Sequence, residues 1–125
     1  MTQTGLDQIR HHTPLELTGR RIGILCHAPS VASDYTHITT IFRSKADCTL
    51  ASVFGPQHGL YGQTQDNMIE WSSSVHPLYG IPLYSLYGEH RKPTPEMLAG
   101  LDAFVVDLQD VGARLYTYVW TVKLC

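Results

Sequence analysis

The sequence predicts an α/β fold with three layers, a Rossmann-like open parallel sheet covered by crossover helices. Short apolar runs rich in strand-forming residues alternate with segments that suit helices, which is the pattern of parallel strands joined by helical crossovers. The clearest run, residues 103–108, is apolar up to Asp107, as expected of a buried strand in the centre of such a sheet. The 125 residues, 43% of them hydrophobic, have the apolar mass for a single core.

Four strands are expected, at residues 21–26, 48–54, 82–87 and 103–108. Proline and glycine bound these runs; Pro29, for example, follows the first. A polar lead-in of residues 1–20 precedes the domain, which takes up residues 21–125. His11 and His12 have no metal-ligand spacing, and we expect them in a disordered start.

Three helices connect or follow these strands. Residues 35–44 form the first, with Ser33 or Asp34 as its N-cap. The second is a short helix after Thr94, whose hydroxyl suits the N-cap position. Residues 113–124 place apolar side chains at helical spacing, although their aromatic and β-branched residues leave a strand as the alternative. We predict a helix there.

Charge and composition narrow the range of partners. The formal net charge is −2 and no run of like charge occurs, so neither nucleic acid nor an anionic membrane surface is an expected partner. No apolar stretch is long enough to cross a bilayer, and the N-terminus lacks the apolar region of a signal peptide. The three cysteines are an odd number and form no CxxC pair, so neither a disulfide framework nor a structural zinc site is expected. We expect no metal or cofactor, and the expected location is a reducing cytoplasm.

The carboxyl ends of the strands are the expected site. In open α/β sheets, ligands bind in the crevice outside these ends. Here the segments after the strands carry histidines and charged residues, and a long polar segment, residues 55–81, follows the second strand. One interpretation is a polar crevice for a hydroxyl-rich substrate; the other is that loops are polar in most proteins.

Three blocks of sequence resemble, in the same order, the bacterial exo-β-N-acetylmuramidase family, long known as a domain of unknown function. Residues 54–62 read FGPQHGLYG, residues 84–88 lead into RKPTPEML at 91–98, and residues 107–118 read DLQDVGARLYTY. The resemblance implies a Rossmann-like N-terminal domain, followed in the family by a smaller C-terminal domain. It also implies release of N-acetylmuramic acid from the non-reducing ends of peptidoglycan fragments.

The resemblance covers residues 5–122 but only about the N-terminal third of a family member. It therefore implies a truncated chain with an incomplete domain, inactive on its own, whose exposed apolar surface favours oligomers. A muramyl saccharide is the implied partner.

The chain departs from the family at the second strand exit. Members usually read FGPEHG where this chain has Gln57, and an amide is neither a general acid nor a nucleophile. A subgroup pairs QHG with a DNMIE segment, as in this chain, so Glu70 is our candidate to bring a carboxylate into the same crevice. His27 stands where many members have asparagine, and keeps a hydrogen-bonding side chain there.

Glycoside cleavage commonly uses two carboxyl groups across the sugar ring. Three candidate catalytic carboxylates are expected at the crevice, with Glu89 a weaker fourth: Glu70, Asp107 and Asp110. Asp107 follows apolar residues, and desolvation would raise its pKa as an acid requires. Alternatively, Asp107 or Asp110 caps the last helix or pairs with Arg114. A substrate-assisted route through the 2-acetamido group needs one enzymic acid and would tolerate Gln57.

The remaining candidates bind substrate. His58, in the first block, is expected to donate to a sugar hydroxyl or assist a carboxylate, or otherwise to satisfy loop carbonyls. Arg91, Lys92 and Arg114 are candidates to hold the lactyl carboxylate, the alternative being solvated surface charges. Tyr116 and Tyr118, two apart on a helix, are expected to face different sides, one in the core and one in the crevice. Gln57 and His27 complete the binding set.

Two other functions remain open. A nucleotide-binding Rossmann module would need a glycine-rich turn after the first strand, and residues 26–30 contain no glycine. A noncatalytic carbohydrate-binding or degenerate member of the family fits both Gln57 and the short length.

Overall fold

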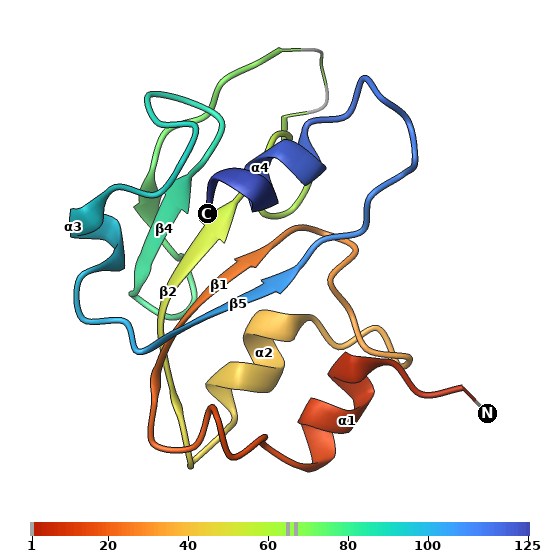
Figure 1. Ribbon diagram of the computed structural model, residues 1–125, viewed down its shortest axis with the longest axis vertical. Helices are drawn as coiled ribbons and strands as arrows, with labels where there is room; N and C mark the ends of the chain where they lie inside the picture. Colours follow the sequence, from red (N-terminus) through yellow and green to blue (C-terminus); the bar gives the residue numbers. More distant parts are fainter. Residues whose placement is uncertain (1, 65, 67) are drawn as a thin grey trace.

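A computed structural model describes residues 2–64, 66 and 68–125. Its centre is a five-stranded sheet in the order β3-β4-β2-β1-β5 (Figure 1). The strands are β1 Arg21–Cys26, β2 Thr49–Gly55, β3 Ser74–Val75, β4 Pro82–Ser85 and β5 Ala103–Asp107. The helices are α1 Gly5–His11, α2 Ile38–Arg43, α3 Pro95–Leu98 and α4 Tyr118–Leu124. The structure therefore confirms the α/β class.

The four predicted strands are present and all their pairings are parallel. β1 lies between β2 and β5, and β2 also pairs with β4. β3 pairs antiparallel with β4 and was not predicted, because two residues give no measurable alternation.

The expectation that residues 103–108 form the central strand is wrong. β5 is at the edge of the sheet in the described part of the chain, and Val106 is 42% exposed. β1 is instead buried at every position after its first. A run of apolar residues predicts a strand, but it shows neither how deeply the strand is buried nor how many strands flank it.

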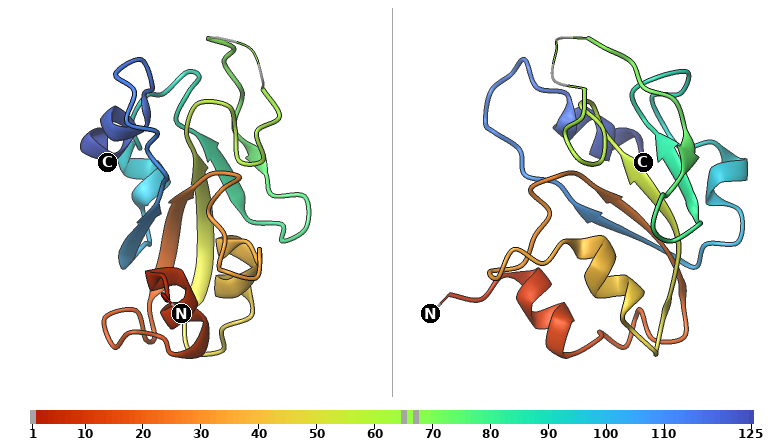
Figure 2. Two further views of the ribbon diagram at one scale, coloured as in Figure 1. Left: turned by 90° about the vertical axis from the view of Figure 1, so that its right-hand side faces the viewer. Right: turned by 180° about the vertical axis from the view of Figure 1, so that it is seen from behind.

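Two apolar clusters occupy the two faces of the sheet. Ile22 and Ile24 of β1 pack with α1 and α2, whereas Leu25 faces the opposite side with Phe54 and residues around α3. The views in Figure 2 show α2 on one side of the sheet and α3 and α4 on the other. Alternate side chains of one strand thus contribute to different layers, as a three-layer fold requires.

The expected disordered start is wrong. Residues 5–11 form α1, whose N-cap Thr4 makes a reciprocal capping box with Asp7. Asp7 also accepts a hydrogen bond from the Ser33 N–H at 2.8 Å, which is the main reason that its pKa is well below the usual range. Leu6 belongs to the core. His11 is the last helical residue, and the polar composition concealed a short, well-capped helix.

The other helices differ from expectation mainly in where they begin. α2 begins at Ile38 with His37, not Ser33 or Asp34, as N-cap, because Tyr35 adopts a φ of 66° that no α-helix contains. Thr94 caps α3 as predicted. The last segment is a helix, but only from Tyr118 onward.

The order of the strands creates a topological switch point. The chain runs outward from β1 through β2 to β4, then returns through α3 to place β5 on the other side of β1. The exits of β1 and β5 therefore lead apart, which opens a crevice between them. Within the described residues, no helix is long and apolar enough to cross a membrane.

Candidate functional site

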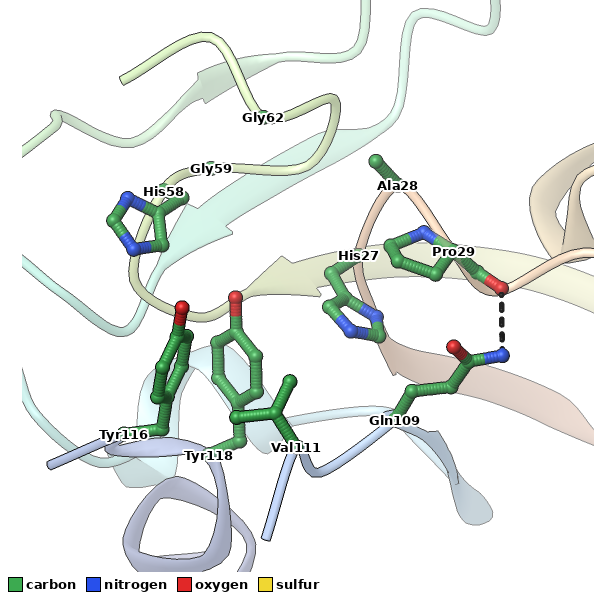
Figure 3. A pocket seen from close by; sticks show the side chains of 10 residues that line it. All are labelled: His27, Ala28, Pro29, His58, Gly59, Gly62, Gln109, Val111, Tyr116 and Tyr118. Atoms are coloured by element: carbon green, nitrogen blue, oxygen red, sulfur yellow. Dashed lines mark hydrogen bonds between the residues drawn. The ribbon is translucent and has the colours of Figure 1, made fainter. Parts of the chain in front are cut away.

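A pocket of about 170 Å³ lies at this switch point, and we call it the strand-exit pocket (Figure 3). Segments that follow β1, β2 and β5 line it, together with the start of α4. Its lining residues are His27, Ala28, Pro29, His58, Gly59, Gly62, Gln109, Val111, Tyr116 and Tyr118. The structure thus brings together four of the predicted site residues, from positions up to 91 residues apart in the chain: His27, His58, Tyr116 and Tyr118.

His58 is held in a fixed tautomer. It has a positive φ of 72°, and its Nδ1 lies 2.7 Å from the carbonyl oxygen of Thr64. A carbonyl only accepts, so Nδ1 carries the proton and donates it. Nε2 of neutral His58 is therefore an acceptor, suited to a hydroxyl group.

His27 is fixed by a chain of hydrogen bonds between the exits of β1 and β5. The hydroxyl of Ser30 donates to the carbonyl of Asp107 at 2.6 Å. It accepts from the His27 N–H at 3.0 Å, and the His27 Nδ1 lies 3.1 Å away. Burial lowers the pKa of His27, an effect that the carbonyl of Gln109 opposes. The ring is thus a neutral imidazole near pH 7.

The two tyrosines share the pocket, so the expectation that they face different sides is wrong, although Tyr118 is buried in the core and Tyr116 is exposed. α4 begins only at Tyr118, and Tyr116 lies in the preceding turn, where helical periodicity does not apply. Their ring centroids are 5.9 Å apart, and both hydroxyl groups point toward the His58 side of the pocket (Figure 3). Tyr118 also makes an edge contact with His27 at 5.0 Å, and burial raises its pKa. Tyr118 is therefore a protonated phenol and a possible donor.

Gln57 lies next to this pocket rather than in its lining. Its side chain is buried, and Oε1 accepts a hydrogen bond of 3.0 Å from the hydroxyl of Thr117. This bond joins the exit of β2 to the segment between the two tyrosines.

The predicted carboxylates do not line the strand-exit pocket. Asp107 instead lines a neighbouring pocket of about 300 Å³ beside α1, which shares Pro29 and Gln109 with the first. Burial raises the pKa of Asp107, although His37 opposes the shift. Asp110 accepts a hydrogen bond from the N–H of Gly112 and, in the described part of the chain, neither caps α4 nor pairs with Arg114.

Glu70 lies in a third pocket, so the expectation that it enters the same crevice is wrong. This Glu70 pocket, of about 270 Å³, also contains Glu89 and His90. Glu70 forms an ion pair with Arg91, whose guanidinium group stacks 4.0 Å from the centre of the Tyr87 ring. The segment around Glu70 therefore lies beside the end of β4 and not at the switch point.

The three predicted cations are not gathered around the strand-exit pocket. Arg91 is engaged by Glu70, while Lys92 and Arg114 are exposed and line none of the three pockets described above. In residues 2–64, 66 and 68–125, no group of three or more His, Cys, Asp or Glu side chains is placed to hold a metal ion.

Sequence reasoning missed Gln109, Ser30 and Thr117. Gln109 lines the pocket and its Nε2 lies 3.4 Å from the carbonyl oxygen of Pro29, bridging the exits of β5 and β1 (Figure 3). Gln109 and Thr117 lie within the third block of resemblance, which was a signal that could have found them.

Comparisons with known proteins agree with this architecture. The family described as "Exo-beta-N-acetylmuramidase NamZ, N-terminal" matches residues 22–125. The chain is 39% identical over 120 residues to the peptidoglycan beta-N-acetylmuramidase NamZ of Bacillus subtilis (strain 168), covering 96% of this chain and 29% of that protein.

Two crystal structures of DUF1343 family proteins from Bacteroides fragilis NCTC 9343 are also similar. One has a TM-score of 0.84 and 32% identity, and the match covers 98% of this chain and 30% of the other. The second has a TM-score of 0.72 and 27% identity, with 96% and 29% covered. The chain thus spans less than a third of the length of these relatives. By sequence and by fold, it belongs to the exo-β-N-acetylmuramidase NamZ family, whose N-terminal part it matches.

Proposed function

We propose that the protein carrying this chain is a glycoside hydrolase that releases N-acetylmuramic acid from the non-reducing ends of peptidoglycan fragments. The observation that carries the proposal is the strand-exit pocket at the switch point, in a chain 39% identical to a peptidoglycan beta-N-acetylmuramidase. In this proposal the protein is cytoplasmic and its partner is a muramyl saccharide. It binds neither nucleic acid nor a membrane.

The chemistry of the pocket suits a sugar. The aromatic rings of Tyr116 and Tyr118 offer apolar surface for the C–H faces of a pyranose, and their hydroxyl groups donate to its oxygens. His58 offers an acceptor for a sugar hydroxyl, and Gln57, beside it, offers an amide. Orientation by a few polar groups on an otherwise apolar lining is typical of small-ligand sites.

For the reaction itself we propose Asp107 as the acid. Its pocket shares Pro29 and Gln109 with the strand-exit pocket, and burial raises the pKa of Asp107, as protonation of a leaving oxygen requires. Since Gln57 can exchange no proton, a route in which the 2-acetamido group of the substrate attacks the anomeric carbon fits this chain, because it needs a single enzymic acid. Asp110, which shares a further pocket with Tyr118, and Glu70, which is paired with Arg91 in a separate pocket, remain weaker candidates.

A second function, sugar binding without turnover, is favoured by one observation. None of the described residues that line the strand-exit pocket is a carboxylic acid. In that case the fold would bind a muramyl end and leave it intact.

One assay separates the two functions. The longest protein that the gene encodes, and the 125-residue chain, are incubated with a chromogenic β-N-acetylmuramide and with the matching β-N-acetylglucosaminide, which lacks the lactyl ether. The hydrolase proposal predicts release of the chromophore from the muramide by the longer protein. Binding of the muramide without release, with activity created by Gln57→Glu, would establish the noncatalytic function.

A further inference from the structure

Thr117 is the N-cap of α4, yet its hydroxyl group does not cap the helix. Two other threonines in this chain show the usual arrangement. Thr4 and Thr94 are extended N-caps whose hydroxyl groups accept from the backbone N–H groups of Asp7 and Met97. Thr117 has φ −96° and ψ −2°, and donates instead to Oε1 of Gln57 at 3.0 Å. The helix thus forgoes a cap that is typically worth about 1 kcal/mol.

The hydroxyl group of Thr117 bonds to Gln57 instead of capping the helix, and the positions of the two residues show what this bond connects. Gln57 immediately precedes His58, and Thr117 stands between Tyr116 and Tyr118. The bond therefore ties the wall of the strand-exit pocket that follows β2 to the wall that enters α4. Gln57 and Thr117 are 60 residues apart, so no local constraint of the chain brings them together.

The bond also orients the amide. With Oε1 accepting from Thr117, the Nε2 group of Gln57 is left to donate, and no described residue accepts from it. Gln57 is buried, so loss of the hydrogen bond from Thr117 would leave its Oε1 without a partner, which is costly. A fixed donor beside His58 and the two tyrosines suits an acceptor oxygen of a sugar, such as its acetamido carbonyl.

We infer that Thr117 is a positioning residue, which holds Gln57 so that its Nε2 group donates to the bound muramyl sugar. The inference rests on the proposed function for the identity of the ligand, but not for the orientation of Gln57. Thr117 itself takes no part in proton transfer.

Two variants of the longest encoded protein test this role. Thr117→Val removes the hydroxyl group at nearly constant shape, and Thr117→Ser keeps it. We expect Thr117→Val to raise KM for the chromogenic muramide about tenfold with kcat little changed, because a binding interaction is lost, and Thr117→Ser to stay within about threefold of the unsubstituted protein. A lower melting temperature with unchanged KM for Thr117→Val would overturn the inference, because the threonine would then serve stability alone.

A second measurement keeps the inference separate from the proposed function. In ¹⁵N-labelled protein, the two side-chain N–H resonances of Gln57 report whether the amide is held in one orientation. We expect them to be dispersed in the unsubstituted protein and in Thr117→Ser, and to move toward the values of a free glutamine in Thr117→Val. If the muramide is neither hydrolysed nor bound, the proposed function is wrong. The spectrum still shows whether Thr117 holds the Gln57 amide in one orientation. If the Gln57 side-chain resonances are unchanged in Thr117→Val, the inference that Thr117 positions Gln57 is overturned.

Discussion

The hydroxyl oxygen of Tyr61 lies 2.9 Å from Nε2 of His76. Nδ1 of the fully buried His76 accepts from the N–H of Leu78, so Nε2 carries the proton and donates it to Tyr61. The imidazole also stacks on Tyr79 with centroids 4.4 Å apart. These contacts anchor much of the long segment between β2 and β4 to the core. A segment whose polarity suggested function is therefore, in this part, structural.

The first prediction concerns this pair. Tyr61→Phe removes the acceptor and leaves the buried Nε2–H of His76 without a partner, so we expect the free energy of unfolding to fall by roughly 1–3 kcal/mol. Urea denaturation measures it. The matched control is Tyr35→Phe, at a tyrosine that is 86% exposed, which should change stability by less than about 0.5 kcal/mol. Equal changes in the free energy of unfolding at both positions would show that the hydrogen bond between His76 and Tyr61 does not stabilise the fold.

The second prediction concerns pH. Burial lowers the pKa of His27, His37 and His76 below the ordinary 6.5 in the folded state. The unfolded chain then binds more protons than the folded one at pH values just below 6.5, so stability is fully present above that pH and declines as the pH falls. Melting temperatures at pH 7.5 and 5.5 test this. A melting temperature that is equal or higher at pH 5.5 would contradict it.

The third prediction concerns Gly88, after β4. A Cβ atom there would lie 2.5 Å from the backbone oxygen of Trp71, which cannot move away as the end of a flexible side chain can. We expect Gly88→Ala to lower the free energy of unfolding by about 1–3 kcal/mol and to displace the Trp71 segment, including the neighbouring Glu70. Gly5→Ala is the control, since a Cβ there meets nothing within 4 Å. Chemical denaturation of both variants gives the comparison, and a neutral Gly88→Ala would show that the segment is loosely held.

The sequence predicted the parallel sheet because apolar runs, and the prolines and glycines that bound them, are local features. It also predicted part of the lining of the candidate pocket, because the carboxyl ends of parallel strands converge. His27 and His58, which follow β1 and β2, lie in one pocket for this reason. It failed for Glu70, because no local pattern shows which way a long loop turns after β2. It also failed for the edge position of β5, because strand order depends on contacts between distant segments.

The fourth prediction distinguishes the carboxylates. In the longest encoded protein, Asp107→Asn should lower turnover of the muramide by about 10²-fold or more, the scale of general acid catalysis. Glu70→Gln should lower it by less than about threefold, because Glu70 is paired with Arg91 in a separate pocket. Steady-state kinetics on both variants measures this. If Glu70→Gln lowered turnover strongly and Asp107→Asn did not, the catalytic acid would lie in the Glu70 pocket and Asp107 would take no part in the reaction.

The central claim is that the strand-exit pocket binds the muramyl sugar, and titration of isotope-labelled protein with N-acetylmuramic acid tests it most directly. We expect chemical-shift changes to concentrate on the residues that line this pocket, above all His27, His58, Tyr116 and Tyr118, and to be weaker with N-acetylglucosamine. His58→Ala should weaken binding, whereas Glu89→Gln, in the Glu70 pocket, should not. Shift changes that concentrate on Glu70, Glu89 and His90, with the strand-exit pocket unaffected, would contradict the claim.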